Sequence, residues 1–402
     1  MKVLISDALP ETTLDKIKNL GAEVTYDPQL KEQSLLEELK KESYEILVVR
    51  STVVTGEMIH SSPALSLIIR AGSGYNTIDV ATASERSVYV ANCPGKNSIA
   101  VAELAFGLML SMDRRIPDNV IQLREGRWNK KEFSKARGIY GKTLGIIGLG
   151  RIGKLMIPRA KAFGLNVIGW SRSLTEQKAE EWDIKHAPDP PTVADEADII
   201  TVHLTATPDT QGFINAEFFN AMKEGAYFIN TSRSEIVDQK ALMEAMDKKG
   251  IRAGIDVFAA EPSSKTGDFQ DDIAKNKNLY GTHHIGASTE QAQNAVADET
   301  VRIVQEYLNT GHVPNCVNIM DRPPAKAMLT IHHRNRIGVL AGVLDIIRDA
   351  RINVERMENI IFEKAQGACA QVQLDDSLSK QDLTRIEGLS EDIFFVKQVE
   401  LS

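Results

Sequence analysis

Short apolar runs alternate with amphipathic stretches along the first hundred residues of the chain. The spacing of apolar positions over Glu32–Glu42 predicts a helix. The apolar runs predict strands at Lys2–Ser6, Glu23–Tyr26, Ile46–Arg50 and Leu67–Ala71. Strands that alternate with helices are typical of a mostly parallel sheet covered on both faces.

A second series of the same kind begins at Lys142. Its predicted strands are the run KTLGIIG and the segments Asn166–Trp170, Ile199–His203, Tyr227–Asn230 and Ala253–Asp256. The nearly continuous apolar run Val101–Met112 predicts a helix buried at a domain or subunit boundary. A long amphipathic helix is predicted near Gly286, with Ser288 and Gln291 spaced as a capping box at its start.

The segment Val313–Lys326 carries three prolines and little periodicity, which predicts a linker. Beyond it, apolar runs and helical patterns follow in the order strand, helix, strand, strand, helix, strand. The second of these helical patterns covers Ser379–Leu389. This order predicts a small separate domain.

Composition narrows the class of protein. A net charge of −8 argues against nonspecific binding of nucleic acid, which requires a positive field. The cysteines at 93, 316 and 369 lie far apart without zinc-site spacing, so we expect neither a disulfide scaffold nor a metal site. We expect no membrane span, because no apolar run reaches about eighteen residues, and no signal peptide at the strand-like start. These features predict a cytoplasmic protein.

A glycine-rich motif lies directly between an apolar strand and a helical pattern. It consists of Gly148, Leu149, Gly150, Arg151, Ile152 and Gly153. The first glycine permits a tight turn, the second allows the backbone to approach a pyrophosphate, and the third allows the helix to pack on the strand. Because the helix start also offers unpaired N–H groups to an anion, the motif predicts a dinucleotide site.

Two features near this motif depart from the usual pattern. Ser171 and Arg172 follow the next strand, where an acid commonly contacts the adenine ribose. A hydroxyl and a guanidinium suit the 2′-phosphate of NADP, whereas a solvated Arg172 would leave a site that accepts NAD. Pro158 falls inside the predicted helix and should kink or shorten it.

Seven motifs give the chain a resemblance to the D-isomer-specific 2-hydroxyacid dehydrogenases, and within them to the phosphoglycerate dehydrogenases. The motifs are VRSTVVT, RAGSGYNTID, NCPGKNSIAVAEL, GKTLGIIGLGRIG, NTSRSEIVD, GIDVFAAEP and HHIGAST, in the order typical of the family. The resemblance implies NAD as the cofactor, with NADP as the alternative, and a small 2-hydroxy or 2-keto acid as the substrate.

The resemblance also implies a catalytic trio of Arg233, Glu261 and His284. Arg233 would clamp the substrate carboxylate and polarise the carbonyl. His284 would exchange a proton with the carbonyl oxygen as hydride moves, and Glu261 would orient the imidazole ring. Each residue taken alone has an ordinary structural explanation, so the functional interpretation depends on the three together.

Further contacts follow from the same resemblance. The matching cofactor positions are Gly148, Gly150, Arg151, Ile152, Gly153, Ser171, Arg172, His203, Thr205, Pro208, Thr231 and Asp256, of which Asp256 has the alternative role of a loop cap. The matching substrate positions are Arg50, Ser51, Arg70, Ser73, Gly74 and Asn97. Arg50 and Arg70 would supply charge for a phosphorylated substrate, unless each pairs with a neighbouring acid.

The chain departs from the family at His283, where proline is common, and at Ser234-Glu235, where the family has two glycines. A carboxylate near the nicotinamide site is unexpected and raises a question about cofactor geometry or substrate choice.

The C-terminal region resembles the amino-acid-binding ACT domain. The resemblance implies an L-serine site at His333, Asn335 and Asn353, whose neutral side chains suit an amino-acid zwitterion. Ile337 replaces a common proline before Gly338. A module that only mediates dimerisation is the alternative.

We therefore expect an α/β protein with two doubly wound parallel-sheet, Rossmann-like domains and a ferredoxin-like βαββαβ ACT domain. Residues 1–97 and 290–317 would bind substrate, 98–289 the dinucleotide, 318–326 would form the linker and 327–402 the ACT domain. We expect a homodimer or homotetramer without nucleic-acid or membrane partners.

The implied activity is oxidation of D-3-phosphoglycerate in serine biosynthesis, with serine feedback. Two alternatives remain at this stage. One is an NADP-preferring glyoxylate or hydroxypyruvate reductase, or another dehydrogenase of the family, which Ser171 and Arg172 favour. The other is a non-enzymatic NAD-sensing corepressor, against which the retained catalytic trio argues.

Overall fold

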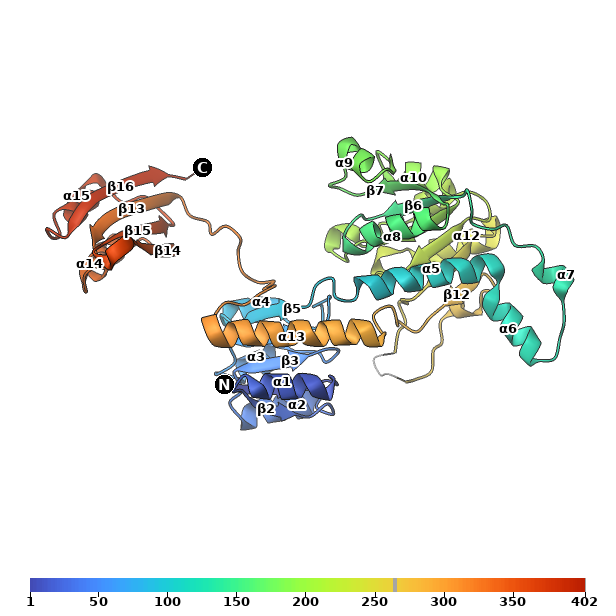
Figure 1. Cartoon of the computed structure of the whole chain (residues 1–402), viewed down its shortest axis with the longest axis horizontal. Coiled ribbons are helices and arrows are strands. Elements are labelled where there is room, and N and C mark those ends of the chain that lie inside the picture. The colour runs from blue at the N-terminus through green and yellow to red at the C-terminus, as the bar shows by residue number, and fades with distance from the viewer. Residues whose placement is uncertain (263–265, 402) are drawn as a thin grey trace. The chain divides into compact units, whose positions relative to one another are not determined.

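Three separate sheets make up the described part of the chain, residues 1–262 and 266–401 of a computed structural model. Two sheets lie in a first unit, Met1–Asn318, and the third lies in a second unit, Ile319–Ser402 (Figure 1). The expected fold class is confirmed, because the first two sheets are parallel and doubly wound and the third is antiparallel.

The first sheet has five parallel strands in the order β2-β1-β3-β4-β5. They are β1 (Lys2–Ile5), β2 (Glu23–Tyr26), β3 (Ile46–Val49), β4 (Leu67–Arg70) and β5 (Tyr89–Asn92). The helices between them are α1 (Glu11–Asn19), α2 (Glu32–Lys41), α3 (Gly56–His60) and α4 (Val80–Glu85). The four predicted strands are correct to within one residue, whereas the short β5 was not predicted.

Helix α13 (Glu290–Thr310) returns to this first sheet (Figure 1). Its buried Val296, Ile303 and Val304 pack in one core with residues of β1, β3 and β4. The predicted capping box at its start is wrong, because Thr289 is the N-cap and accepts a bond from the N–H of Ala292 at 3.1 Å.

The chain after α13 also joins the first sheet. Val317 donates its N–H to the carbonyl of Val90 at 2.8 Å, and the Asn318 side chain accepts the N–H of Val90 at 2.8 Å. Residues 313–318 are therefore not a free linker, although their sequence lacks periodicity, because β5 supplies partners that no local pattern reveals.

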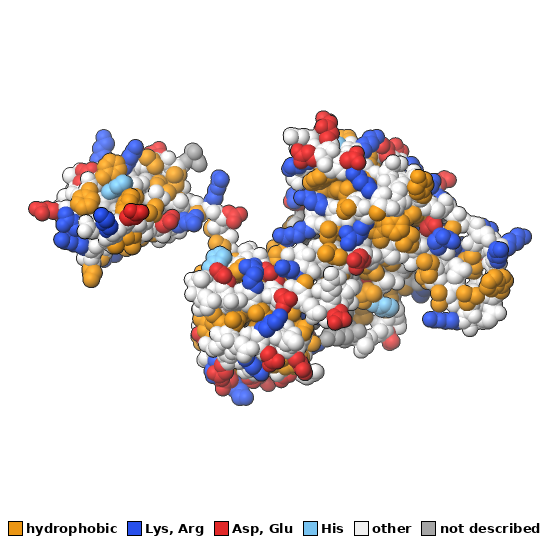
Figure 2. Space-filling view, viewed as in Figure 1, with side chains coloured by type: hydrophobic (Ala, Val, Ile, Leu, Met, Phe, Trp, Pro, Cys, Tyr) orange, Lys and Arg blue, Asp and Glu red, His pale blue; other side chains and the backbone are white. Residues whose placement is uncertain are grey.

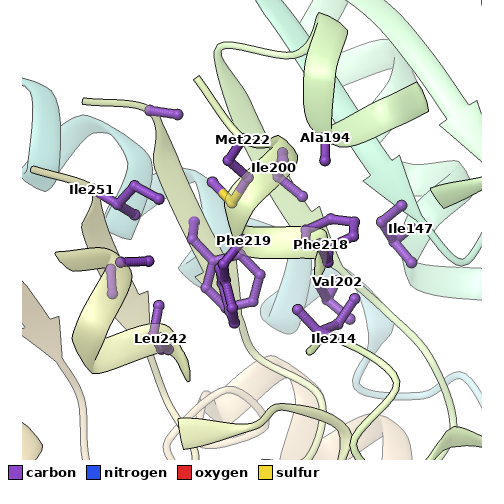
Figure 3. Packing of buried hydrophobic residues seen from close by; sticks show 14 of the residues in the cluster. Ile147, Ala194, Ile200, Val202, Ile214, Phe218, Phe219, Met222, Leu242 and Ile251 are labelled. Carbon is purple, nitrogen blue, oxygen red and sulfur yellow. The ribbon is translucent and has the colours of Figure 1, made fainter. Parts of the chain in front are cut away.

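The second sheet has seven parallel strands in the order β12-β11-β10-β9-β6-β7-β8. They are β6 (Thr143–Ile147), β7 (Asn166–Trp170), β8 (Lys185–His186), β9 (Ile199–Val202), β10 (Tyr227–Asn230), β11 (Arg252–Ile255) and β12 (Leu279–Gly281). Its helices are α5 (Ser98–Arg114), α8 (Arg151–Ala162), α9 (Glu176–Glu181), α10 (Pro190–Glu196), α11 (Ala216–Ala221) and α12 (Gln239–Lys249). Phe218 and Phe219 pack edge to face in one core (Figure 3), and Phe219 also packs edge to face against Phe228.

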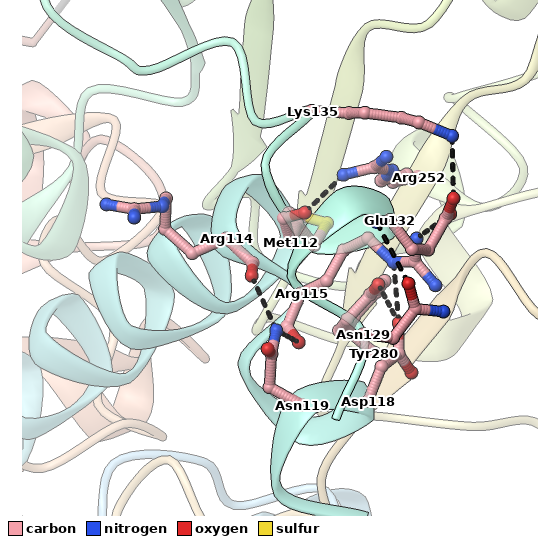
Figure 4. Close-up of polar contacts among 10 residues, drawn as sticks. All are labelled: Met112, Arg114, Arg115, Asp118, Asn119, Asn129, Glu132, Lys135, Arg252 and Tyr280. Carbon is pink, nitrogen blue, oxygen red and sulfur yellow. Dashed lines mark hydrogen bonds and ion pairs between the residues drawn. The ribbon is translucent and has the colours of Figure 1, made fainter. Parts of the chain in front are cut away.

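Two short helices, α6 (Ile116–Arg124) and α7 (Lys130–Phe133), form an arm that projects from the end of α5 (Figure 1). Arg115 holds the base of the arm, because its guanidinium pairs with Asp118 at 2.9 Å and Glu132 at 2.7 Å (Figure 4). Tyr280 of β12 also donates to Asp118 at 3.0 Å. No residue of α6 is buried.

The second unit has the order strand, helix, strand, strand, helix, strand that the sequence predicts. Its elements are β13 (Ala327–Arg334), α14 (Val339–Asp349), β14 (Val354–Ile361), β15 (Gly367–Leu374), α15 (Lys380–Glu387) and β16 (Ile393–Glu400). The sheet order β14-β15-β13-β16, antiparallel throughout, is that of a ferredoxin-like fold. Within the described residues, no helix is both long and apolar enough to span a membrane.

Candidate functional site

Parallel sheets bind ligands where the strand order reverses, beyond the carboxyl ends of the strands. In the second sheet the order reverses between β6 and β9. The loop after β6 carries Gly148 at φ 95°, and a Cβ there would lie 2.7 Å from the carbonyl of His203, the residue after β9. A Cβ at Gly153 would overlap the carbonyl of Gly148. Both glycines are therefore required by close backbone contacts.

Gly150 is the N-cap of α8, and the space beside its Cα is open. Arg151 and Ile152 form the first turn of the helix, and the Arg151 side chain lies against Gly95. Of the two effects predicted for Pro158, a kink or a shortening, the shortening is wrong, because α8 continues past it to Ala162. The open N-terminus of α8 can approach an anionic group.

Other predicted cofactor positions line the same edge of the second sheet. Thr231, after β10, has a buried hydroxyl without a hydrogen-bond partner in the described structure. His203 shares a hydrogen bond between Nε2 and the Thr201 hydroxyl at 2.9 Å, and its buried Nδ1 is likewise unpartnered. Burial lowers the pKa of His203 to about 3, so its ring is neutral. The glycine cradle and these unpartnered atoms fit a polar dinucleotide.

Four further cofactor positions lie nearer the surface. Ser171 and Arg172 follow β7, and Arg172 is exposed. The carbonyl of Thr205 accepts a bond from the Thr210 hydroxyl at 2.7 Å, and Pro208 begins a short 3-10 helix, Pro208–Thr210. These bonds shape the loop after β9.

Arg233 follows β10 on a loop held by Asn230. The amide of Asn230 donates to the Arg233 carbonyl at 2.9 Å, while its oxygen accepts from the N–H and hydroxyl of Ser232. The Arg233 guanidinium donates to the Ser232 carbonyl at 2.7 Å and lies against Gly74, where a Cβ would be 2.6 Å from Nη2. Gly74 follows β4 of the first sheet and Arg233 follows β10 of the second, so loops from the two parallel sheets are in contact at this point.

His284 and Glu261 form a hydrogen bond of 2.7 Å between Nδ1 and Oε2. The bond to Glu261 raises the pKa of His284 against the opposing effect of burial, and the charges of Glu261 and Asp256 add to the increase. Burial works to raise the pKa of Glu261, but bonds from His284 and the Phe258 N–H outweigh it, so that pKa lies below its usual range. Arg233 interacts electrostatically with both groups.

Asp256 holds the loop that carries His284. Its buried carboxylate accepts bonds from the Thr282 hydroxyl at 2.6 Å and from the N–H groups of Ile285 and Gly286 at 2.8 Å each. These bonds lie on both sides of His284, whose φ of 52° is unusual for a residue other than glycine. The structure thus gives Asp256 the role of a loop cap.

A cluster at the carboxyl ends of β3 and β4 consists of Arg50, Arg70 and Arg233. The pKa of Arg70 falls to about 10 because its side chain is buried and because Arg233 and Arg50 repel its charge. Arg70 Nε is buried without a hydrogen-bond partner among the described residues, and its guanidinium lies against Gly72. Neither Arg50 nor Arg70 forms an ion pair with an acid of the described chain, which argues against the salt-bridge alternative.

The remaining predicted substrate positions lie beside this cluster. Ser73 donates its hydroxyl to the Asn97 side chain at 2.7 Å. The Ser51 hydroxyl instead donates to Asp7 at 3.0 Å. Sequence reasoning missed Asp7, although its position directly after the first predicted strand was a usable signal.

Glu235 and His283, at which the chain departs from the family's pattern, are both exposed. Glu235 lies in a 3-10 helix, Ser234–Ile236, where the Ser234 hydroxyl donates to its carboxylate at 3.1 Å. His283 points to the surface next to His284 in sequence. In the described ranges, no group of three or more His, Cys, Asp and Glu residues is arranged to hold a metal ion.

The predicted effector residues do not all lie together. His333 is buried and bonds to Asn359, and Asn335 donates to the Ala365 carbonyl at 3.1 Å, both near one end of the third sheet. Asn353 precedes Val354, which pairs with Leu374 at the opposite end. One copy therefore cannot bring all three residues to one small ligand.

Comparisons with known proteins agree with this geometry. The sequence model described as D-isomer specific 2-hydroxyacid dehydrogenase, NAD binding domain, matches residues 106–286. A D-3-phosphoglycerate dehydrogenase of Methanocaldococcus jannaschii is 36% identical over 93% of this chain and 67% of its own length. A hydroxypyruvate reductase of Thermotoga maritima is 39% identical over 66% of this chain and 85% of its own.

A solved NAD⁺-bound 3-phosphoglycerate dehydrogenase of Entamoeba histolytica is similar with a TM-score of 0.65 and 25% identity, over 80% of this chain and 99% of that one. The sequence matches span only 60–67% of the length of three D-3-phosphoglycerate dehydrogenases. Together, the two doubly wound sheets, the motifs and these similarities show that the chain belongs to the D-isomer-specific 2-hydroxyacid dehydrogenase family.

Proposed function

We propose that this protein is an NAD-dependent D-3-phosphoglycerate dehydrogenase, which oxidises 3-phosphoglycerate to 3-phosphohydroxypyruvate. The observation that carries the proposal is the cluster of Arg50, Arg70 and Arg233 beside the Glu261–His284 pair. Arg50 and Arg233 repel the charge of the half-buried Arg70, and an anionic ligand between these cations would offset the repulsion. A substrate with both a carboxylate and a phosphate supplies two such anions.

Each group of the trio has a distinct task under this proposal. NAD supplies the hydride acceptor when it is bound on the glycine cradle. Arg233 binds the substrate carboxylate and orients the reacting carbon. His284 accepts the hydroxyl proton at Nε2 during oxidation, because its Nδ1 is engaged by Glu261, and returns a proton during reduction. Arg50 and Arg70 bind the phosphate.

Steady-state turnover tests this assignment. We expect faster oxidation of NADH with phosphohydroxypyruvate than with hydroxypyruvate or glyoxylate, and a 10²–10⁴-fold loss of kcat in His284→Asn. His283→Asn is the matched control and should retain activity. No turnover of any of these acids would contradict the proposal and favour the NAD-sensing corepressor instead.

A hydroxypyruvate or glyoxylate reductase is the second candidate. The exposed Arg172 after β7 and the 39% identity to a hydroxypyruvate reductase favour it. In that case the unphosphorylated acids would be turned over faster, with NADPH preferred to NADH. Arg172→Asp should then weaken NADPH use selectively, since an acid repels the 2′-phosphate.

The second unit is proposed to be a regulatory ACT domain that binds L-serine. Its ferredoxin-like order and the adjacent His333 and Asn335 support the proposal. Because Asn353 lies at the other end of the sheet, a site with all three residues requires two copies of the chain. Inhibition by serine that is lost in Asn335→Ala would support this role, whereas unchanged activity with serine would leave assembly as the unit's function.

We also propose that the protein associates as two or four copies and that it is cytoplasmic. The arm supports self-association, because exposed apolar residues gather on it. They are Ile116, Val120, Ile121 and Leu123 of α6 and Trp128 beyond the helix. Figure 2 shows apolar and basic side chains together on this part of the surface.

A further inference from the structure

The carboxylate of Asp7 lies at the point where the strand order of the first sheet reverses. Asp7 follows β1, and its neighbour β3 ends just before Arg50. Only 5% of the residue is exposed. No predicted catalytic or substrate position included it, yet it lies at the switch point where ligands of such sheets bind.

Asp7 receives three consecutive backbone N–H groups. Its Oδ2 accepts those of Arg50 at 2.7 Å, Ser51 at 2.9 Å and Thr52 at 2.9 Å, and Oδ1 accepts the Ser51 hydroxyl at 3.0 Å. Converging N–H groups of this kind form an anion-binding concavity. Here the protein's own carboxylate fills it, so the turn after β3 is held rigidly and its N–H groups are not available to substrate.

The charge of Asp7 also bears on the arginines. Arg50 and Arg233 both repel Arg70, while Asp7 attracts it. Burial would raise the pKa of Asp7, but the N–H donors outweigh it and hold that pKa below normal, so the group is ionised at neutral pH. A fixed negative charge therefore lies next to the cationic cluster.

We propose that Asp7 is a positioning residue that determines selectivity for a phosphorylated substrate. It holds the backbone turn that carries the Arg50 side chain, and its charge offsets the repulsion between Arg50 and Arg70 before substrate binds. This inference rests on the proposed function, because Arg50 and Arg70 must bind the phosphate.

The test compares wild type with Asp7→Asn in the full chain. The Asn side chain is neutral and keeps only one acceptor oxygen, so the substitution removes the negative charge and weakens the bonds to the turn. We expect the KM for phosphohydroxypyruvate to rise at least tenfold while kcat and the KM for hydroxypyruvate change less than threefold. In an Arg50→Gln background, Asp7→Asn should not further change the KM for phosphohydroxypyruvate relative to that for hydroxypyruvate, because Asp7 acts through Arg50. Asp189→Asn is a matched control, since it removes a carboxylate that caps α10 far from the site.

Three outcomes separate the hypotheses. Equal losses with both substrates in Asp7→Asn would show a merely structural role and overturn the inference alone. A wild type without preference for the phosphorylated acid, and without inhibition by inorganic phosphate, would overturn the proposed function and the inference with it. If Asp7→Asn does not fold, Asp7→Glu keeps the charge but displaces the acceptor oxygens from the N–H groups of residues 50–52, and a KM increase confined to phosphohydroxypyruvate is expected; an equal change for both acids would contradict the inference.

Discussion

At the scale of single residues, the bond between Glu261 and His284 sets both the orientation and the proton affinity of the imidazole ring. Glu261 is itself held by the Phe258 N–H at 2.7 Å, so the carboxylate cannot rotate freely away from the ring. Asp256 fixes the backbone on either side of His284. The ring is thus positioned from two directions by carboxylates that need not touch the substrate.

Replacement of Glu261 by Gln should shift the pH profile to lower pH. Glu261 contributes the largest effect that raises the pKa of His284, so its removal lowers that pKa. Reduction requires protonated His284 and declines as pH rises through this pKa, so the decline should begin at lower pH in the variant. The measurement is kcat/KM against pH in the reducing direction, and an unchanged profile would exclude His284 as the titrating group.

At the scale of elements, Glu299 of α13 connects the helix to the chain that crosses between the parallel sheets. Its carboxylate pairs with Arg302 at 2.6 Å and with Lys96 at 3.0 Å, and it accepts the Asn315 amide at 2.7 Å. Lys96 precedes Asn97, a proposed substrate contact. Arg302, followed by smaller effects of Lys96 and Asn315, lowers the pKa of Glu299 from 4.5 to about 2.

Replacement of Glu299 by Gln should therefore lower the free energy of unfolding by about 2 kcal/mol at pH 7. The folded-state pKa is depressed, so the stabilisation is complete above pH 4.5 and is lost as pH falls toward 2. The difference between wild type and variant should shrink over that range in urea titrations. Asp272→Asn breaks an exposed pair and is the control; a difference that does not depend on pH would contradict this account.

At the scale of the whole molecule, the arm formed by α6 and α7 is the clearest candidate for self-association. Its base is held by Arg115 through two ion pairs (Figure 4), whereas no residue of α6 is buried in the described chain. Ile121 is 53% exposed and Leu123 is 56% exposed. A second copy that covered them would remove apolar surface from water.

The substitutions Ile121→Glu and Leu123→Glu should together convert a dimer to a monomer. Charged groups cannot be buried at an interface without partners, so the molar mass measured by light scattering should fall by half. Met320→Glu changes an exposed apolar residue that is not part of the arm and should leave the mass unchanged. A double variant with the mass of the wild type would exclude the arm as the contact.

Much of the architecture follows from local patterns alone. The strands of both parallel sheets, the glycine motif and the order of elements in the second unit depend on side-chain periodicity and backbone freedom, which are properties of neighbouring residues. The strands β8 and β12 were missed, because two or three residues carry too little periodicity. The strand β5 was also missed, although it is as long as the predicted β1 to β4. The N-cap of α13 was misplaced by one residue, since two adjacent hydroxyl residues compete for the role.

The sequence by itself determined the family and the glycines that the backbone geometry requires, and it predicted the proposed catalytic trio. Only the tertiary structure decided that Arg70 lacks an acidic partner, that Asp7 holds the turn after β3, and that Asn353 lies away from His333. The physical reason is distance along the chain. Electrostatic interactions and hydrogen bonds depend on which groups folding brings together, and no local pattern records pairs such as Asp7 with Arg50 or Gly74 with Arg233.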